Sequence, residues 1–155
     1  MEIFPLILIS PILLYCAFND LKNLKIPNFI PGLSLIIFFS MIYIIGLPEF
    51  EERVLQGLLV FGICFLLFSL RLLGGGDAKL IPVVFLFIPS SEITTFMLCL
   101  STGMTITLFG LSQARSYMPI TVDSWRALRS KRALPMGPAI ATATMIFLVL
   151  QLNLF

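Results

Sequence analysis

Aspartates are the residues of this chain whose type and position best suit chemistry. The 155 residues contain three of them, Asp20, Asp77 and Asp123, and no histidine. Catalysis by Ser-His or Cys-His pairs is therefore excluded, together with most zinc chemistry. Any reaction must use carboxylates, hydroxyls, lysine or arginine. Asp20 and Asp77 each lie at the edge of an apolar run, where a charge is costly, so they are the first candidates.

Asp77 follows three glycines, in the stretch LRLLGGGDAK between two apolar runs. Gly74, Gly75 and Gly76 permit positive φ and the close approach of another backbone, a geometry that can present a carboxylate to a peptide substrate. A tight turn between helices has the same composition, so the glycine run alone is a weak signal. A phosphate-binding loop is disfavoured because no Gly-Lys-Ser/Thr follows, and a dinucleotide-binding turn is excluded because no strand precedes the glycines.

Asp20 ends an apolar run and opens the sequence DLKNLKIPN. Pro27 fixes its own φ and biases the residue before it towards an extended conformation, so we expect the chain to turn here before the next helix. Asn28 is expected to cap that helix through its side-chain oxygen. Lys22 and Lys25 are typical of residues that anchor a link at the membrane surface.

Two carboxylates that meet can hydrolyse an amide without histidine or metal. If Asp20 and Asp77 approach closely, repulsion and desolvation keep one protonated while the other is ionised. The ionised member takes a proton from water, and the protonated member donates to the amide carbonyl. Such a pair titrates as a unit, so we assign no individual roles. From spacing alone, a structural alternative is equally well supported: the two aspartates lie at the membrane interface and pair with Lys22, Lys25 or Lys79.

Composition predicts an all-α, polytopic integral membrane protein with a single domain, residues 1–155. Of the residues, 59% are hydrophobic and 12% charged, against roughly a quarter charged in an ordinary globular chain. About six transmembrane helices are expected, and the fourth covers only about 14 Å, so it either extends into its flanks or starts below the interface. The expected segments are Ile3–Phe18, Phe29–Ile45, Val54–Leu70, Leu80–Ile88, Ile93–Leu111 and Pro138–Phe155.

Charge asymmetry predicts the orientation. The links Asp20–Asn28, Arg71–Lys79 and Ser112–Gly137 hold nine of the ten basic residues, while the opposite links hold Arg53 and the glutamates. The positive-inside rule therefore places the N-terminus outside and all three aspartates at the cytoplasmic face. Within the last inner link, the segment Ser116–Pro135 combines Trp125 with basic residues. It suits either an interfacial segment near anionic lipid or a solvated loop that only sets topology.

No metal, cofactor or nucleic acid is expected as a ligand. Cys16, Cys64 and Cys99 lie inside apolar runs without a CxxC pair, and we interpret them as packing residues. We expect membrane lipid among the partners, and the oligomeric state, including a homo-oligomer, stays open.

Three stretches together resemble the type IV prepilin peptidase family. GGGD at 74–77, followed by Ala78, Lys79 and Leu80, resembles that family's GxGD-x-K-L motif. DLKNLKIPN at 20–28 resembles its first aspartate with the IPN turn, and RALPMGPAIA at 132–141 resembles its Pro-x-Gly-Pro start of the last helix. The three occur in the same order and cover most of the chain, so the combination is more specific than any one motif.

The resemblance implies an aspartic endopeptidase of the cell's inner membrane. Such enzymes remove the short basic leader of prepilins at the cytoplasmic face, just before the pilin's apolar helix. Larger relatives carry an additional cysteine-containing domain associated with N-methylation. We find no counterpart of that domain in this chain, which is similar to the small, peptidase-only form of tight-adherence (Flp-type) systems or to a preflagellin-type relative. By resemblance, the catalytic residues are Asp20 and Asp77, and the supporting residues are Gly74, Gly75, Gly76, Lys79, Pro27 and Asn28.

Two other functions stay open at this point. An intramembrane protease of the same GxGD type would cut within a bilayer helix, and the short fourth segment motivates it. A small transporter or assembly subunit would use the carboxylates as proton or cation ligands. Asp123 matches no motif and is interpreted as a loop residue near Arg126.

Overall fold

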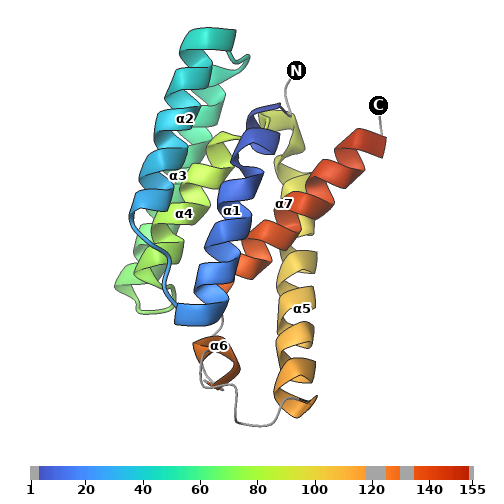
Figure 1. Ribbon diagram of the computed structural model, residues 1–155. Coiled ribbons are helices and arrows are strands. Elements are labelled where there is room, and N and C mark those ends of the chain that lie inside the picture. Colours follow the sequence, from blue (N-terminus) through green and yellow to red (C-terminus); the bar gives the residue numbers. More distant parts are fainter. Residues whose placement is uncertain (1–3, 118–124, 130–134, 154–155) are drawn as a thin grey trace.

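The apolar runs fold into helices, four of which are longer than the predicted runs. A computed structural model describes residues 4–117, 125–129 and 135–153, and within these ranges it contains helices and no strand (Figure 1), so the all-α prediction is confirmed. The elements are α1 (Phe4–Asn23), α2 (Phe29–Ile45), α3 (Phe50–Ser69), α4 (Gly75–Leu86), the 3-10 turn η1 (Ser90–Glu92), α5 (Ile93–Tyr117), α6 (Arg126–Arg129) and α7 (Met136–Asn153).

Length and apolarity qualify several of these helices to cross a membrane. Among the described residues, three stretches meet both criteria, namely α1, α3 and the continuous Ser90–Tyr117 stretch of η1 and α5. Two shorter apolar helices, α2 and α7, accompany them. A polytopic membrane protein is therefore supported, whereas the six spans and the outward N-terminus stay predictions.

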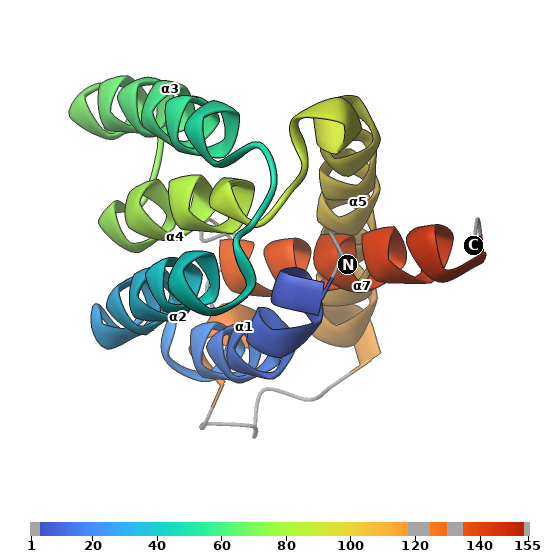
Figure 2. The same cartoon turned by 90° about the horizontal axis from the view of Figure 1, so that it is seen from above.

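The helices form two groups that meet along α4 and α7. Seen from above, α4 lies between α2 and α3, while α7 crosses α5 and runs beside α1 (Figure 2). Gly103 permits the α5–α7 crossing, because a Cβ there would lie 2.6 Å from the carbonyl oxygen of Ala139. Phe85, Phe96 and Phe147 join the groups through edge-to-face contacts with ring centroids 5.3 and 5.6 Å apart.

Helix boundaries differ from the predicted segments where the chemistry-bearing residues lie. The first helix continues five residues beyond Phe18 to Asn23, and α4 starts at Gly75, five residues before Leu80. Asp20 and Asp77 are consequently helical residues, whereas hydropathy alone predicts that they belong to the links. Polar residues extend helices past their apolar stretch because the backbone hydrogen bonds continue. The carbonyl of Asp20, for example, accepts from Leu24 N at 2.8 Å.

The prediction that Arg53 belongs to an outer link is wrong. Since α3 begins at Phe50, Arg53 lies in its first turn and is 0% exposed. Its Nη1 donates to the carbonyl of Phe87 at 3.1 Å, and Gln56 Nε2 donates to the carbonyl of Phe85 at 2.9 Å. Carbonyls at a helix end have no partner within the helix, so these side chains allow the 12-residue α4 to end inside the apolar bundle.

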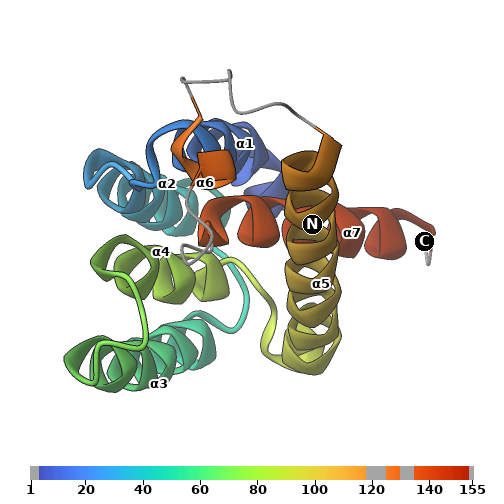
Figure 3. The ribbon, with the colours of Figure 1, turned by 90° about the horizontal axis from the view of Figure 1, so that it is seen from below.

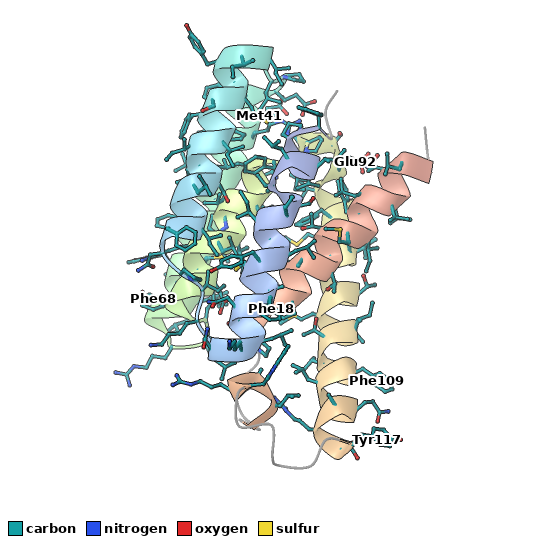
Figure 4. All side chains as sticks on the ribbon, viewed as in Figure 1. Phe18, Met41, Phe68, Glu92, Phe109 and Tyr117 are labelled. Carbon is teal, nitrogen blue, oxygen red and sulfur yellow. The ribbon has the colours of Figure 1, made fainter. Side chains whose placement is uncertain are left out.

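A second polar contact ties the α2–α3 link to the segment between α4 and α5. The backbone N–H and the hydroxyl of Ser90 donate to Glu49 Oε2 at 3.2 and 2.7 Å, and Glu52 Oε2 lies 2.6 Å from the same hydroxyl. These hydrogen bonds lower the pKa of exposed Glu49 below its ordinary value, and the Ser90 hydroxyl has a larger effect than the Ser90 N–H. Figure 4 labels Met41 and Glu92 near this end of the bundle.

Candidate active site

Asp20 is a buried carboxylate held by the backbone of the last helix. Its side chain is 5% exposed, and Oδ2 accepts a hydrogen bond from Gly137 N at 2.8 Å. Gly137 is the second residue of α7, so its N–H has no partner within the helix. The positive end of the α7 dipole also favours a negative group at this point. Asp20 is therefore fixed by a donor that is well suited to the ionised carboxylate.

Glycine is required at position 137 because α1 and α7 touch there. A Cβ on Gly137 would lie 2.9 Å from Asp20 Cβ and 3.3 Å from Ala17 Cα. The sequence analysis did not include Gly137 among the site residues, although it lies in the Pro-Met-Gly-Pro stretch that carried the third resemblance. A glycine at a helix start signals a free N–H, but sequence alone does not say which acceptor the N–H meets.

Asp77 lies in the first turn of α4, half-buried, and its carboxyl is within range of the charge of Asp20. The fully buried Cys16, one turn before Asp20 on α1, lies within range of both charges. Seen from below, the end of α1 and the starts of α4 and α7 are at the same end of the bundle (Figure 3). The structure therefore brings together the two aspartates that the sequence singled out.

The predicted glycines act through close packing and not through positive φ. Gly74 precedes α4 in an extended conformation, while Gly75 and Gly76 are its first residues. A Cβ on Gly76 would lie 2.9 Å from Ile26 Cβ, and one on Gly75 would lie 3.2 Å from Phe68 Cε2. A Cβ on Gly74 would lie 2.6 Å from Asp77 Oδ2. The glycines thus let the 24–28 turn and the Asp77 carboxyl approach the start of α4.

The prediction that Asn28 caps the second helix through its side chain is also wrong. Its side chain forms no capping hydrogen bond to α2; instead its Oδ1 accepts from Lys79 Nζ at 3.2 Å. The backbone of the turn closes without the cap, since the carbonyl of Pro27 accepts from Ile30 N at 3.1 Å. Lys79 consequently bonds the turn and forms no ion pair with Asp20 or Asp77, the two aspartates that the structure describes. Through Gly76 and Lys79, the predicted supporting residues fasten the 24–28 turn to α4.

The long basic link contributes one described element near the site. Trp125, just before α6, packs edge to face on Phe18 with ring centroids 5.6 Å apart, and Arg115 Nη2 donates to the carbonyl of Ala127 at 2.7 Å. Phe18 is labelled at the lower end of the bundle in Figure 4. Asp123 and most of the Ser116–Pro135 segment lie outside the described residues. In the described ranges, no three His, Cys, Asp or Glu side chains gather as metal ligands would.

Fold and site together define a class: a helical protein with membrane-spanning character, in which two carboxylates from different helices lie within electrostatic range at one end of the bundle. The sequence model of the type IV leader peptidase family matches residues 7–111, roughly two thirds of the chain, including Asp20 and Asp77. The chain belongs to this family. A search among curated proteins found no match, and a search among solved structures found none either.

Proposed function

We propose that this peptidase removes the short basic leader of a prepilin, most closely of the Flp type, at the cytoplasmic face of the inner membrane. The observation that carries the proposal is that Asp20 and Asp77, two carboxylates from two separate motifs, lie within electrostatic range at one end of a membrane-type bundle. The basic residues of the 20–28 and 71–79 links belong to the same end, which supports its placement at the cytoplasmic face.

Catalysis would use the pair as acid and base. The ionised carboxylate takes a proton from water, whose oxygen attacks the scissile carbonyl carbon, while the protonated carboxyl gives its proton to the carbonyl oxygen. The tetrahedral intermediate then collapses: the carboxyl that took the proton passes it to the leaving nitrogen, and the C–N bond breaks. Because Gly137 N–H occupies Oδ2 of Asp20, the other oxygen of that carboxylate is left to face water or substrate.

The test is cleavage of a candidate prepilin that carries a short basic leader and a glycine before its apolar helix. Asp20→Asn and Asp77→Asn keep the size and shape of the side chain but remove the titrating group. Each is expected to abolish cleavage while the protein still accumulates in the membrane. Wild-type cleavage by either variant would refute the two-aspartate mechanism.

Mapping the cut site and the product tests the remaining parts of the proposal. A cut before the apolar stretch of the substrate agrees with a leader peptidase, whereas a cut inside that stretch identifies an intramembrane protease. The mature pilin is expected to keep an unmethylated N-terminus, which mass spectrometry of the product checks. If several prepilins stay uncut and Asp→Glu variants retain partial transport of an ion, the carboxylates serve a transporter.

A further inference from the structure

A groove behind α4 is separate from the aspartates. It lies between α2 and α3 with α4 as its floor and has a volume of about 450 Å³. Lys79, Pro82, Val83 and Leu86 line it from α4, a spacing that places them on one helical face. Asp77 is not among the lining residues, because it lies two residues before Lys79 and therefore on nearly the opposite side of the helix. A ligand in this groove is therefore not presented to the carboxylates.

The groove is apolar along its length and polar at one end. Aromatic and aliphatic side chains of α2 and α3 form its walls, among them Phe39, Leu58 and Phe61, which are 56%, 62% and 48% exposed. These exposed apolar side chains open the groove towards the bilayer. Among the described lining residues, Lys79 is the charged one, and with Asn28 it forms the end of the groove nearest the 24–28 turn. Figure 4 shows nitrogen-tipped side chains gathered at this lower end.

The shape of the groove suits a hydrocarbon chain. From Asn28 to Phe39 the α2 wall runs about 17 Å at 1.5 Å per residue, and apolar side chains line the groove along this length. Because the groove is open towards the bilayer, an extended acyl chain can enter it from the side.

We infer that this groove binds an anionic phospholipid, with an acyl chain between α2 and α3 and the phosphate at Lys79. The end of the groove suits an anionic headgroup because Lys79 carries a positive charge and further cations belong to the same end of the bundle: Lys22 in the last turn of α1, and Lys25 and Arg71 in the two links. The proposed site also accounts for the Asn28–Lys79 hydrogen bond. This bond joins two of the three stretches that carry the family resemblance, and it does not involve the carboxylates.

Glycines supply a variant and a matched control. A Cβ on Gly32, which lines the groove, would have no atom within 4 Å, so Gly32→Leu fills the groove without displacing a neighbour. Gly62 on α3 has equally open surroundings but does not line the groove, so Gly62→Leu makes the same chemical change outside it. Both substitutions replace a helical glycine by a better helix former, so both variants are expected to fold.

The experiment measures cross-linking of photoactivatable phosphatidylglycerol and phosphatidylcholine, with identical acyl chains, to the purified Asp77→Asn protein. Cross-links are expected on α2 and α3, with phosphatidylglycerol favoured at least about fivefold, a preference in the range that one interfacial cation provides. Gly32→Leu is expected to lose them and Gly62→Leu to keep them. Lys79→Gln is expected to remove the preference for phosphatidylglycerol while phosphatidylcholine still cross-links.

Several outcomes would overturn the inference. Equal labelling of Gly32→Leu and Gly62→Leu would show that the groove is not the site, and equal labelling by both lipids in the parent protein would show that the headgroup is not recognised. Protection of α2 and α3 by added prepilin, with neither lipid displacing it, would assign the groove to the substrate instead. Because no cleavage is measured, failure of the proposed peptidase function leaves this test unaffected.

Discussion

A backbone donor orients the carboxylate of Asp20, and this makes Gly137 the most sensitive position near the site. Its N–H is fixed by α7 and its missing Cβ leaves the space that Asp20 and Ala17 occupy. A side chain that had to donate this bond would bring rotamer freedom, whereas a helix terminus brings none. The carboxylate is thus positioned by the packing of two helices.

Gly137→Ala tests this positioning. The added methyl group would meet Asp20 Cβ at 2.9 Å, so we expect the carboxylate to shift and cleavage to fall on the order of 100-fold, as displacements of about 1 Å at active sites cause. The measurement is kcat on a prepilin substrate, normalised to the protein present in the membrane.

Gly110→Ala is the control, because a Cβ there has no atom within 4 Å and the residue is helical as well. Cleavage by Gly137→Ala at the rate of the control variant would mean that the Gly137 contact does not position Asp20.

At the scale of elements, α4 is the helix whose ends matter most. Its first turn holds Asp77, and its last carbonyls are received by Arg53 and Gln56 of α3. Hydropathy predicted that this segment is short, and this is correct. It did not predict that the helix starts at Gly75 or that Arg53 is buried, because both depend on which neighbours α4 meets after folding.

Loss of the polar contacts at the end of α4 is expected to destabilise the protein. Gln56→Leu removes the side-chain donor to the buried carbonyl of Phe85, which keeps the N–H of Ile88 at 3.2 Å, and a lost hydrogen bond typically costs about 0.5–1.5 kcal/mol. Arg53→Met is expected to cost at least as much, since the guanidinium serves the carbonyls of both Phe87 and Pro48. Unfolding in mixed micelles measures both changes.

Leu59→Met, an exposed substitution on the same helix, provides the control for α3. Equal stability of Gln56→Leu and Leu59→Met would show that the end of α4 does not need the amide.

The contact between Glu49 and Ser90 predicts a pH dependence of stability. The pKa of Glu49 is lower in the folded protein than its ordinary value of 4.5, because the Ser90 hydroxyl and then its N–H donate to the ionised carboxylate. Because the pKa of Glu49 is lowered by folding, the stabilisation that ionised Glu49 gives the folded protein is fully present above the unfolded pKa. This stabilisation is lost as the pH falls through the folded pKa. Unfolding midpoints of Glu49→Gln and wild type are therefore expected to converge as the pH falls from above 4.5 through the lowered pKa of the folded state. A constant difference between them at all pH values would contradict this assignment.

For the whole molecule, charge asymmetry predicts a direction in the membrane that cysteine labelling can test. Lys25 in the 24–28 turn and Ser91 in η1 are exposed and belong to opposite links, while the native cysteines are buried and give little background. In intact cells, a membrane-impermeant maleimide is expected to label Ser91→Cys. It should label Lys25→Cys only after the cells are permeabilised. The reverse pattern would place the aspartates outside.

Sequence reasoning was most accurate where a property is local and additive. Hydropathy identified the apolar helices, and the positions of Asp20 and Asp77 at the edges of apolar runs singled them out as candidates, while their action as a catalytic pair stays a prediction. It was wrong on Asn28, whose oxygen bonds Lys79 because the 24–28 turn packs against α4, a tertiary contact that overrides the capping preference. It missed Gly137 for the same reason, since the acceptor of a helix-terminal N–H is set by packing.

The hydrogen bond between Gly137 and Asp20 also has a consequence for biosynthesis. Chains emerge from the ribosome from the N-terminus onwards, so α1 and α4 are made well before α7. Until α7 inserts beside α1, Asp20 lacks the donor that orients it. A nascent chain therefore holds both aspartates but not the finished site, and the peptidase is expected to gain activity only when its last helix joins the bundle.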